Sequence, residues 1–184
     1  MKEDPVDRIV AQWRRERPDL DSSPMAIFGR IYRISRIMSD RVAAIYRAYG
    51  IGRGEFDVLA TLRRAGAPYT LSPKEMTATL MLTSGGMTGR LDRLERAGLV
   101  TRAPDPDDRR ALRIGLTPKG LEVIDKAVVA GLRPQHEALA VLPEDDRKRF
   151  SGLLRDLLGE LERGEPECAN DGGRQREHVP GSRE

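Results

Sequence analysis

The chain has 184 residues, of which 39% are hydrophobic and 33% charged, enough for one domain with a core. Only 4% are aromatic, so we expect an aliphatic core, and the formal net charge of +3 is mild support for an anionic partner. A single cysteine, Cys168, excludes a disulfide framework within the chain and indicates a reducing compartment. There is no signal peptide, no apolar run near the ~20 residues that span a bilayer and no Cys/His spacing for zinc. We therefore expect a cytoplasmic protein that uses no membrane, metal or other cofactor.

Two helices are predicted before residue 50, and each begins with a polar cap residue followed by proline. Asp4 starts a short helix that stops before Pro18, and Ser23 starts a long one of about 26 residues that ends at Gly50. The short helix needs a surface to lie against, because it has an apolar side. This side consists of Val6, Ile9, Val10 and Trp13.

Two further helices follow a glycine-rich break at 50–54. The first covers 55–66 and is closed by Gly66. Within it Asp57 and Arg64 are seven residues apart, nearly two turns, so their side chains share one face about 10 Å apart along the axis. The second covers 72–80 and starts at Ser72, with Glu75 in the third position of a capping box.

The stretch 83–100 predicts a helix with a narrow apolar stripe and a small, polar outer face. Met87, Leu91 and Leu94 form the stripe, and Gly98 ends the helix. On the outer face, small residues and guanidinium groups would approach a grooved partner closely, and we expect it to bind DNA rather than to be merely solvated. Its candidate contacts are Ser84, Gly85, Thr88, Arg93 and Arg96. With the helix before it, the stretch predicts a helix-turn-helix.

A β-hairpin is predicted directly after this helix. Residues 99–102 and 112–116 each show some alternation, and the loop between them is rich in turn residues. The loop carries Arg109 and Arg110, which are further candidates for DNA contact. A basic hairpin in this position is typical of a wing.

The rest of the chain predicts two helices and a tail. One helix begins at Thr117 and runs toward Pro134, and the last begins at Pro143 and has a broad leucine face that requires a partner helix. From residue 164 onward almost nothing is available for burial, and we expect disorder. The expected organisation is one domain with an extra helix (1–20), a dimerisation and scaffold helix (21–50), a DNA-binding region (51–117), dimerisation helices (118–163) and a tail (164–184).

Residues 25–162 resemble the MarR family of winged-helix transcriptional regulators, and the wing DPDDRR followed by LTPKG is the most specific part of the resemblance. The resemblance implies a mainly α fold with a small β-hairpin wing, a winged helix-turn-helix joined to an intertwined helical dimerisation region. It also implies a homodimer that binds a pseudo-palindromic, double-stranded DNA operator with one recognition helix per major groove. In the family, the arginine at the position of Arg110 reaches the minor groove, and the aspartate at that of Asp108 braces it.

A narrower resemblance is to the urate-responsive subgroup of that family. Trp13, Asp57, Arg64 and Arg90 stand where the subgroup carries its Trp, Asp, Arg and Arg, and the extra N-terminal helix is also typical of it. Independently of the resemblance, Arg90 lies beside the apolar stripe of its helix, a better place for the interior than for DNA. An aromatic ring, two cations and a carboxylate suit a small planar anion.

The functional hypothesis is therefore a non-enzymatic, ligand-responsive transcriptional regulator, most often a repressor, released from DNA by a small anionic metabolite. Urate fits the resemblance, and a cationic pocket would also accept a polycarboxylate. Each pocket residue has a simpler interpretation, because Trp13 could pack, Asp57 could complement a helix dipole, and the arginines could lie on the surface. The alternatives are an effector-independent or architectural DNA-binding protein and an interaction module that does not bind DNA. No catalytic constellation is present.

Overall fold

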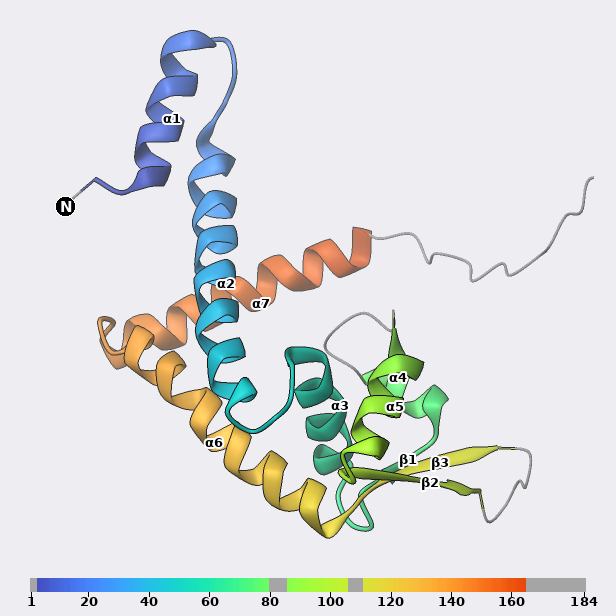
Figure 1. The fold of residues 1–184 in the computed structure, drawn as a ribbon. Helices are drawn as coiled ribbons and strands as arrows, with labels where there is room; N and C mark the ends of the chain where they lie inside the picture. Colours follow the sequence, from blue (N-terminus) through green and yellow to red (C-terminus); the bar gives the residue numbers. More distant parts are fainter. Residues whose placement is uncertain (1–2, 80–85, 106–110, 165–184) are drawn as a thin grey trace, which may run out of the picture. The chain divides into compact units, whose positions relative to one another are not determined.

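The computed structural model describes residues 3–79, 86–105 and 111–164 of the chain. The chain divides into two compact units, Met1–Ala138 and Leu139–Glu184. The predicted disorder of the tail, and Cys168 within it, lie outside the described residues. In chain order the elements are α1 (Pro5–Glu16), α2 (Ser23–Arg47), α3 (Arg53–Arg64), β1 (Thr70–Leu71), α4 (Pro73–Thr79), α5 (Met87–Arg96), β2 (Val100–Pro104), β3 (Leu112–Leu116), α6 (Pro118–Leu139) and α7 (Glu144–Gly164) (Figure 1).

Local signals in the sequence account for most helix ends. The Asp4 carboxylate accepts hydrogen bonds from the backbone N–H groups of Val6 (2.7 Å) and Asp7 (3.0 Å) and so caps α1. Gly66 and Gly98 have φ of +80° and +68° and follow the last turns of α3 and α5, a backbone conformation that favours glycine. These ends confirm the cap predicted at Asp4 and the stops predicted at Gly66 and Gly98. The cap predicted at Ser23 is wrong, because Ser23 is the first residue of α2 and its backbone N–H donates to the carboxylate of Asp21.

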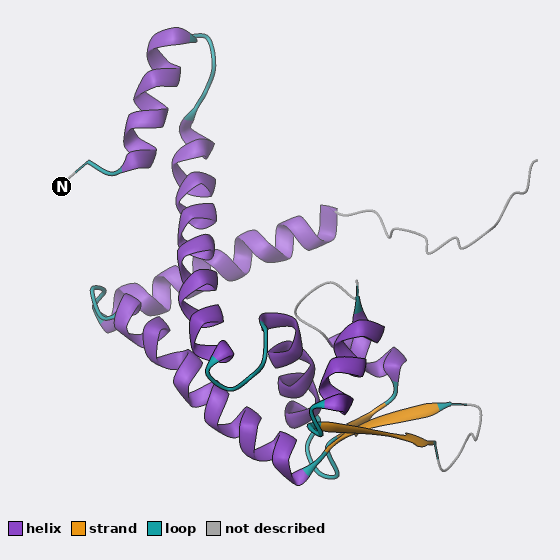
Figure 2. Ribbon diagram, in the orientation of Figure 1, coloured by secondary structure: helices purple, strands orange, loops and turns teal. Residues whose placement is uncertain are grey.

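The strands form one small antiparallel sheet in the order β1-β3-β2 (Figure 2). The β2–β3 hairpin is the predicted one, and it pairs Val100 with Leu116 and Pro104 with Leu112. Strand β1 was not predicted. It has only two residues and pairs Thr70 with Gly115, so it is too short to show alternation in the sequence.

Helix α6 continues past Pro134, where the sequence suggested an end. Pro134 lies buried inside the helix, which runs to Leu139. A proline has no backbone N–H to donate within a helix. In α6 the turns before and after Pro134 nevertheless remain helical. The Gln135 side chain, for example, donates a hydrogen bond of 3.2 Å to the carbonyl oxygen of Gly131.

The core of the first unit is built around α3. Six consecutive residues of this helix, Asp57–Leu62, are buried, so neighbours cover it on several sides. It packs against α2, α4, α5 and β3, and Ile124 and Ala127 of α6 belong to the same apolar cluster. The core is largely aliphatic, as expected from the composition. Its buried position makes α3 the centre of the core, which α2, α4, α5 and β3 surround.

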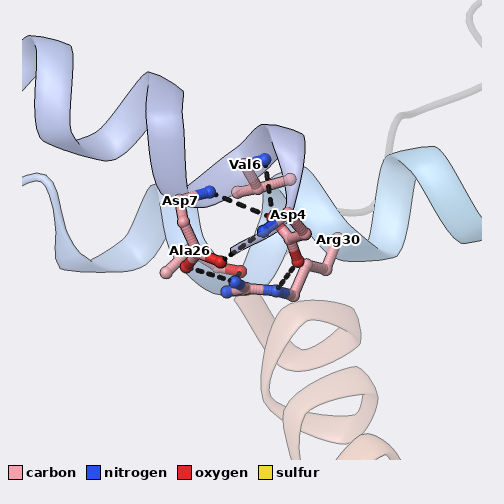
Figure 3. Close-up of polar contacts among 5 residues, drawn as sticks. All are labelled: Asp4, Val6, Asp7, Ala26 and Arg30. Atoms are coloured by element: carbon pink, nitrogen blue, oxygen red, sulfur yellow. Dashed lines mark hydrogen bonds and ion pairs between the residues drawn. The ribbon is translucent and has the colours of Figure 1, made fainter. Parts of the chain in front are cut away.

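Helix α1 packs against the first half of α2 and is fastened there by Arg30 of α2 (Figure 3). The Arg30 guanidinium donates through Nε to Asp4 (2.8 Å) and through Nη2 to Asp7 (2.5 Å). These are the same carboxylates that cap α1. The side chains of Val6 and Val10 are buried between the helices, and a Cβ at Gly29 would stand only 3.0 Å from Val6. One guanidinium therefore binds both carboxylates that cap α1 and so attaches α1 to α2.

We expect α1 to detach in acid. Backbone N–H groups first, and Arg30 in addition, hold the pKa values of Asp4 and Asp7 below their ordinary value. Carboxyl groups with lowered pKa stabilise the folded state fully above the unfolded value of about 3.9 and lose this contribution as pH falls through the lowered pKa. The protection of the amides in residues 5–16, measured as their exchange rate relative to the intrinsic rate at the same pH, should fall below about pH 4, before global unfolding. Arg30→Met should show fast exchange already at neutral pH, and unchanged exchange in that variant would contradict the fastening role.

Candidate nucleic-acid interface and adjoining cavity

Helix α5 presents the predicted outer face, in so far as the structure describes it. Leu91 and Leu94 are buried against the core, whereas Thr88, Arg93 and Arg96 are on the polar side of the helix. Ser84 and Gly85, which the sequence adds to this face, lie outside the described residues, as do Asp108, Arg109 and Arg110 of the wing. The separation of an apolar side from a polar, cationic side agrees with the periodicity.

Arg93 has a partner that the sequence did not indicate. Its Nε donates a hydrogen bond of 2.7 Å to Oε1 of Glu55, in the first turn of α3. The Glu55 side chain is 14% exposed and that of Arg93 is 57% exposed. Burial disfavours the Glu55 carboxylate, but its hydrogen bond with Arg93 and its other bonds outweigh this and lower the pKa of Glu55. Helix α5 is thus tied to the start of α3 by a charged pair.

Arg90 lies against the same turn of α3. A Cβ added to Gly54 would stand 2.5 Å from Nε of Arg90 and 3.0 Å from its Cζ. A side chain at position 54 would therefore have to displace the end of the Arg90 side chain from this place. The structure therefore places Arg90 against α3, which is the inward orientation expected from its position beside the apolar stripe.

The hairpin carries ion pairs that the sequence did not indicate, one at its loop end and others between β2 and α5. Nε of Arg113 on β3 lies 2.8 Å from Oδ2 of Asp105, whose side chain is 10% exposed. Nη2 of Arg102 on β2 lies 2.5 Å from Oδ1 of Asp92 on α5. The first pair joins the two sides of the hairpin at its loop end, and the second joins β2 to α5. The sequence carries only a faint signal for either, namely charges in strands that otherwise alternate.

A cavity of about 330 Å³ adjoins this interface and lies among α2, α3 and α6. One wall is a stacked aromatic pair, Tyr46 and Phe56, with ring centroids 3.9 Å apart and an interplanar angle of 11°. Three arginines, Arg53, Arg63 and Arg64, are among the lining residues. A flat aromatic wall and several guanidinium groups are suited to a planar organic anion.

The arginines differ in their contacts. Nε of Arg63 is 2.8 Å from Oδ1 of Asp125 on α6, and its guanidinium lies over the ring of Tyr69. Nη2 of Arg64 donates a 3.0 Å hydrogen bond to Oγ1 of Thr61. The positive charge of Arg63 is therefore partly compensated by a carboxylate, whereas the described contact of Arg64 is with a neutral hydroxyl.

The four predicted pocket residues are not all brought together in the described part of the chain. Arg64 lines the cavity, but Trp13, Asp57 and Arg90 are not among its lining residues. Asp57 directly follows Phe56, which lines the cavity. Burial raises the pKa of Tyr46, the positive charge of Arg53 opposes this, and the negative charge of Asp57 adds to it. Trp13 lies on α1 with 42% of its surface exposed. The four-residue pocket stays a prediction, and the structure adds Arg53 and Arg63 as candidates.

Within the described residues, no helix is long and apolar enough to cross a membrane. No group of three or more His, Cys, Asp or Glu side chains in that part of the chain is placed to hold a metal ion.

Known proteins with similar sequences and folds are transcriptional regulators. The sequence profile of the MarR family matches residues 49–111. The chain is 40% identical over 158 residues to the HTH-type transcriptional regulator PecS of Dickeya dadantii (strain 3937), and the match covers 86% of this chain and 93% of that protein. The fold of this chain is similar to that of a MarR family transcriptional regulator from Streptomyces coelicolor. The TM-score is 0.64 at 24% identity, and the match covers 79% of this chain and 100% of the other. A mutant MarR from E. coli complexed with operator DNA gives a TM-score of 0.63, 23% identity and coverage of 79% and 97%. These similarities confirm the predicted winged-helix fold.

We expect the largely buried ion pair between Asp105 and Arg113 to stabilise the hairpin more than an exposed ion pair of the same length stabilises its own surroundings. Asp105→Asn should destabilise the hairpin by about 1–3 kcal/mol, because it removes the charge that Arg113 faces in a largely buried position. Asp125→Asn is the matched control, since its pair with Arg63 has the same 2.8 Å separation but both side chains are more than 40% exposed. That variant should cost less than about 1 kcal/mol. Amide exchange of residues 100–105 and 112–116, with urea unfolding, would measure both, and equal costs would refute the role of burial.

Proposed function

The chain belongs to the MarR family of DNA-binding transcriptional regulators, and we propose that it is a homodimeric repressor released from a pseudo-palindromic operator by a small anionic effector. The family is not enzymatic, and its members bind operator DNA. The observation that carries the finer proposal is the cationic cavity with its aromatic wall, which shares the first turn of α3 with the helix that bears Arg93 and Arg96.

Operator binding is assigned to α5 and the wing. The polar side of α5, together with Arg109 and Arg110 of the wing loop, would supply contacts in the major and minor grooves. The proposal keeps Ser84, Gly85 and Thr88 as close contacts at the start of the recognition helix. Asp108 would brace the wing loop in addition to the pair at its base.

Dimerisation is assigned to the apolar side of α7 and to α2. In α7 the large apolar side chains are exposed within the single chain, as are several in α2. Those of α7 are Phe150, Leu153, Leu154, Leu158 and Leu161. An apolar helix face of this length in water favours association, and a second copy of the chain is the partner that a two-fold symmetric operator requires.

The effector is proposed to be a planar, urate-like anion that stacks on Tyr46 and Phe56 and pairs with Arg64. Asp57, whose Oδ2 is buried without a hydrogen-bond partner among the described residues, would be repelled by such an anion and would pass the effect to Arg90 on α5. A coupling free energy of about 1–3 kcal/mol between the two sites is enough for release. A polycarboxylate is the second effector class that this cavity would accept.

We expect Arg93→Ala to weaken operator binding more than binding to random DNA. The loss on operator should be about 1–3 kcal/mol if the guanidinium reads a base edge. Arg110→Ala should instead reduce the salt slope of binding by about 0.9 for each phosphate that is no longer neutralised. Fluorescence anisotropy with the duplex that the wild-type protein selects from a random pool would measure both, with Arg15→Ala on α1 as a control for loss of one charge. Equal losses on operator and random DNA would assign Arg93 to the phosphate backbone.

We expect urate or a tricarboxylate to release the operator and to change the emission of Trp13 in a saturable way. Trp13 is the single tryptophan of the sequence, so its signal has one source. Arg64→Ala should abolish the release while leaving operator affinity in the absence of ligand within about twofold, because Arg64 lies in the cavity wall and not on the polar side of α5. Asp57→Asn should alter operator affinity even without ligand.

The two anions should be titrated side by side. If neither releases the operator at millimolar concentration, the effector proposal fails and an effector-independent regulator is the better description. Release without any change in Trp13 emission would keep the cavity but remove Trp13 from it.

A further inference from the structure

The carboxylate of Glu55 binds two different elements at once. Oε2 accepts a hydrogen bond of 3.1 Å from the backbone N–H of Gly52, which caps α3, and Oε1 accepts one of 2.7 Å from Nε of Arg93 on α5. Nη2 of Arg93 lies 2.5 Å from the same Oε1. Both oxygens are therefore in use, and the carboxylate cannot rotate without breaking one of these hydrogen bonds.

One glycine makes room for this arrangement, and a second lies beside it. A Cβ at Gly52 would stand 2.5 Å from Oε2 of Glu55, so a side chain there would displace the carboxylate. A Cβ at Gly89, one turn before Arg93 on α5, would stand 3.6 Å from Nη1 of Arg93. The guanidinium thus lies along α5 towards its first turn, held at Nε and Nη2, while Nη1 lies over Gly89.

The side chains of Glu55 and Arg93 differ in burial, and this difference suits a role of Glu55 in orienting Arg93. The Glu55 side chain is 14% exposed and fixed in the first turn of α3, whereas the Arg93 side chain is 57% exposed. An ion pair between two freely exposed side chains has little effect on stability. A fixed carboxylate that holds a mobile guanidinium instead reduces the number of positions that the guanidinium samples before it meets its target.

We propose that Glu55 is a positioning residue for operator recognition, which fixes the guanidinium of Arg93 along Gly89 so that it meets a base edge in one orientation. This inference rests on the proposed contact between Arg93 and the operator. Glu55 itself would not touch DNA. Its negative charge opposes binding to any phosphate backbone, so its benefit is in the preference for operator over random DNA.

Glu55→Gln separates positioning from capping. The glutamine carbonyl oxygen still accepts the Gly52 N–H, but its amide then turns a donor toward Arg93, which has only donors. We expect the ratio of operator to random DNA affinity to fall about tenfold, while affinity for random DNA stays equal or rises with the loss of one negative charge. Glu75→Gln is the matched control, because Glu75 caps α4 in the same way through a 2.7 Å hydrogen bond from the N–H of Ser72. In Glu75→Gln, the ratio of operator to random DNA affinity should stay within twofold of the wild-type ratio.

The deciding measurement is a double-mutant cycle on this affinity ratio with full-length protein of verified helicity and melting temperature. In the Arg93→Ala background, Glu55→Gln should change the ratio by less than about twofold. An undiminished loss in that background, or an unchanged ratio in Glu55→Gln alone, would overturn the inference. If Arg93→Ala itself leaves the ratio unchanged, the proposed operator contact fails as well, whereas a loss in Arg93→Ala without one in Glu55→Gln removes the positioning role alone.

Discussion

The burial of α3 is the constraint on which the rest of the first unit depends. A helix with six consecutive buried residues cannot be shifted or rotated without opening the core on several sides. Its first turn nevertheless has functions on two sides. Phe56 stacks on Tyr46 of α2 and forms a wall of the cavity, while Glu55 and Gly54 receive the arginines of α5. The cavity and the recognition helix are therefore connected by one rigid turn.

The acidic side chains around this turn are largely buried, and three arginines line the cavity. Glu55 and Asp57 are both largely removed from water, at the start of α3. Arg53, Arg63 and Arg64 are on the cavity side. An ionised group in a partly buried site interacts more strongly with its neighbours than one in water. The proposed anion in the cavity would therefore change the electrostatic environment of the turn that carries Glu55.

The sequence predicted most elements but few of the contacts between them. Caps, stops and apolar periodicity are local, so Asp4, Gly66 and Gly98 marked helix ends correctly, and the wing hairpin followed from its position. Strand β1 was missed because two residues show no period, and the continuation of α6 through Pro134 because a proline usually ends a helix. The pairs Glu55–Arg93 and Asp105–Arg113 join residues that are distant along the chain, or separated by a loop. No local pattern distinguishes such charges from solvated ones, which is why Arg53 and Arg63 were also not singled out.

The helical structure of α1 depends on its attachment to α2 through Arg30. A helix of twelve residues is marginal on its own in water, and the two carboxylates that cap it are also the ones that bind α2. An undocked α1 would keep only the cap bonds within its own first turn, which are too few to hold a helix of this length in water, so we expect the segment to be helical only while it is docked. Any surface that competes for Arg30 would release the segment as coil rather than as a free helix.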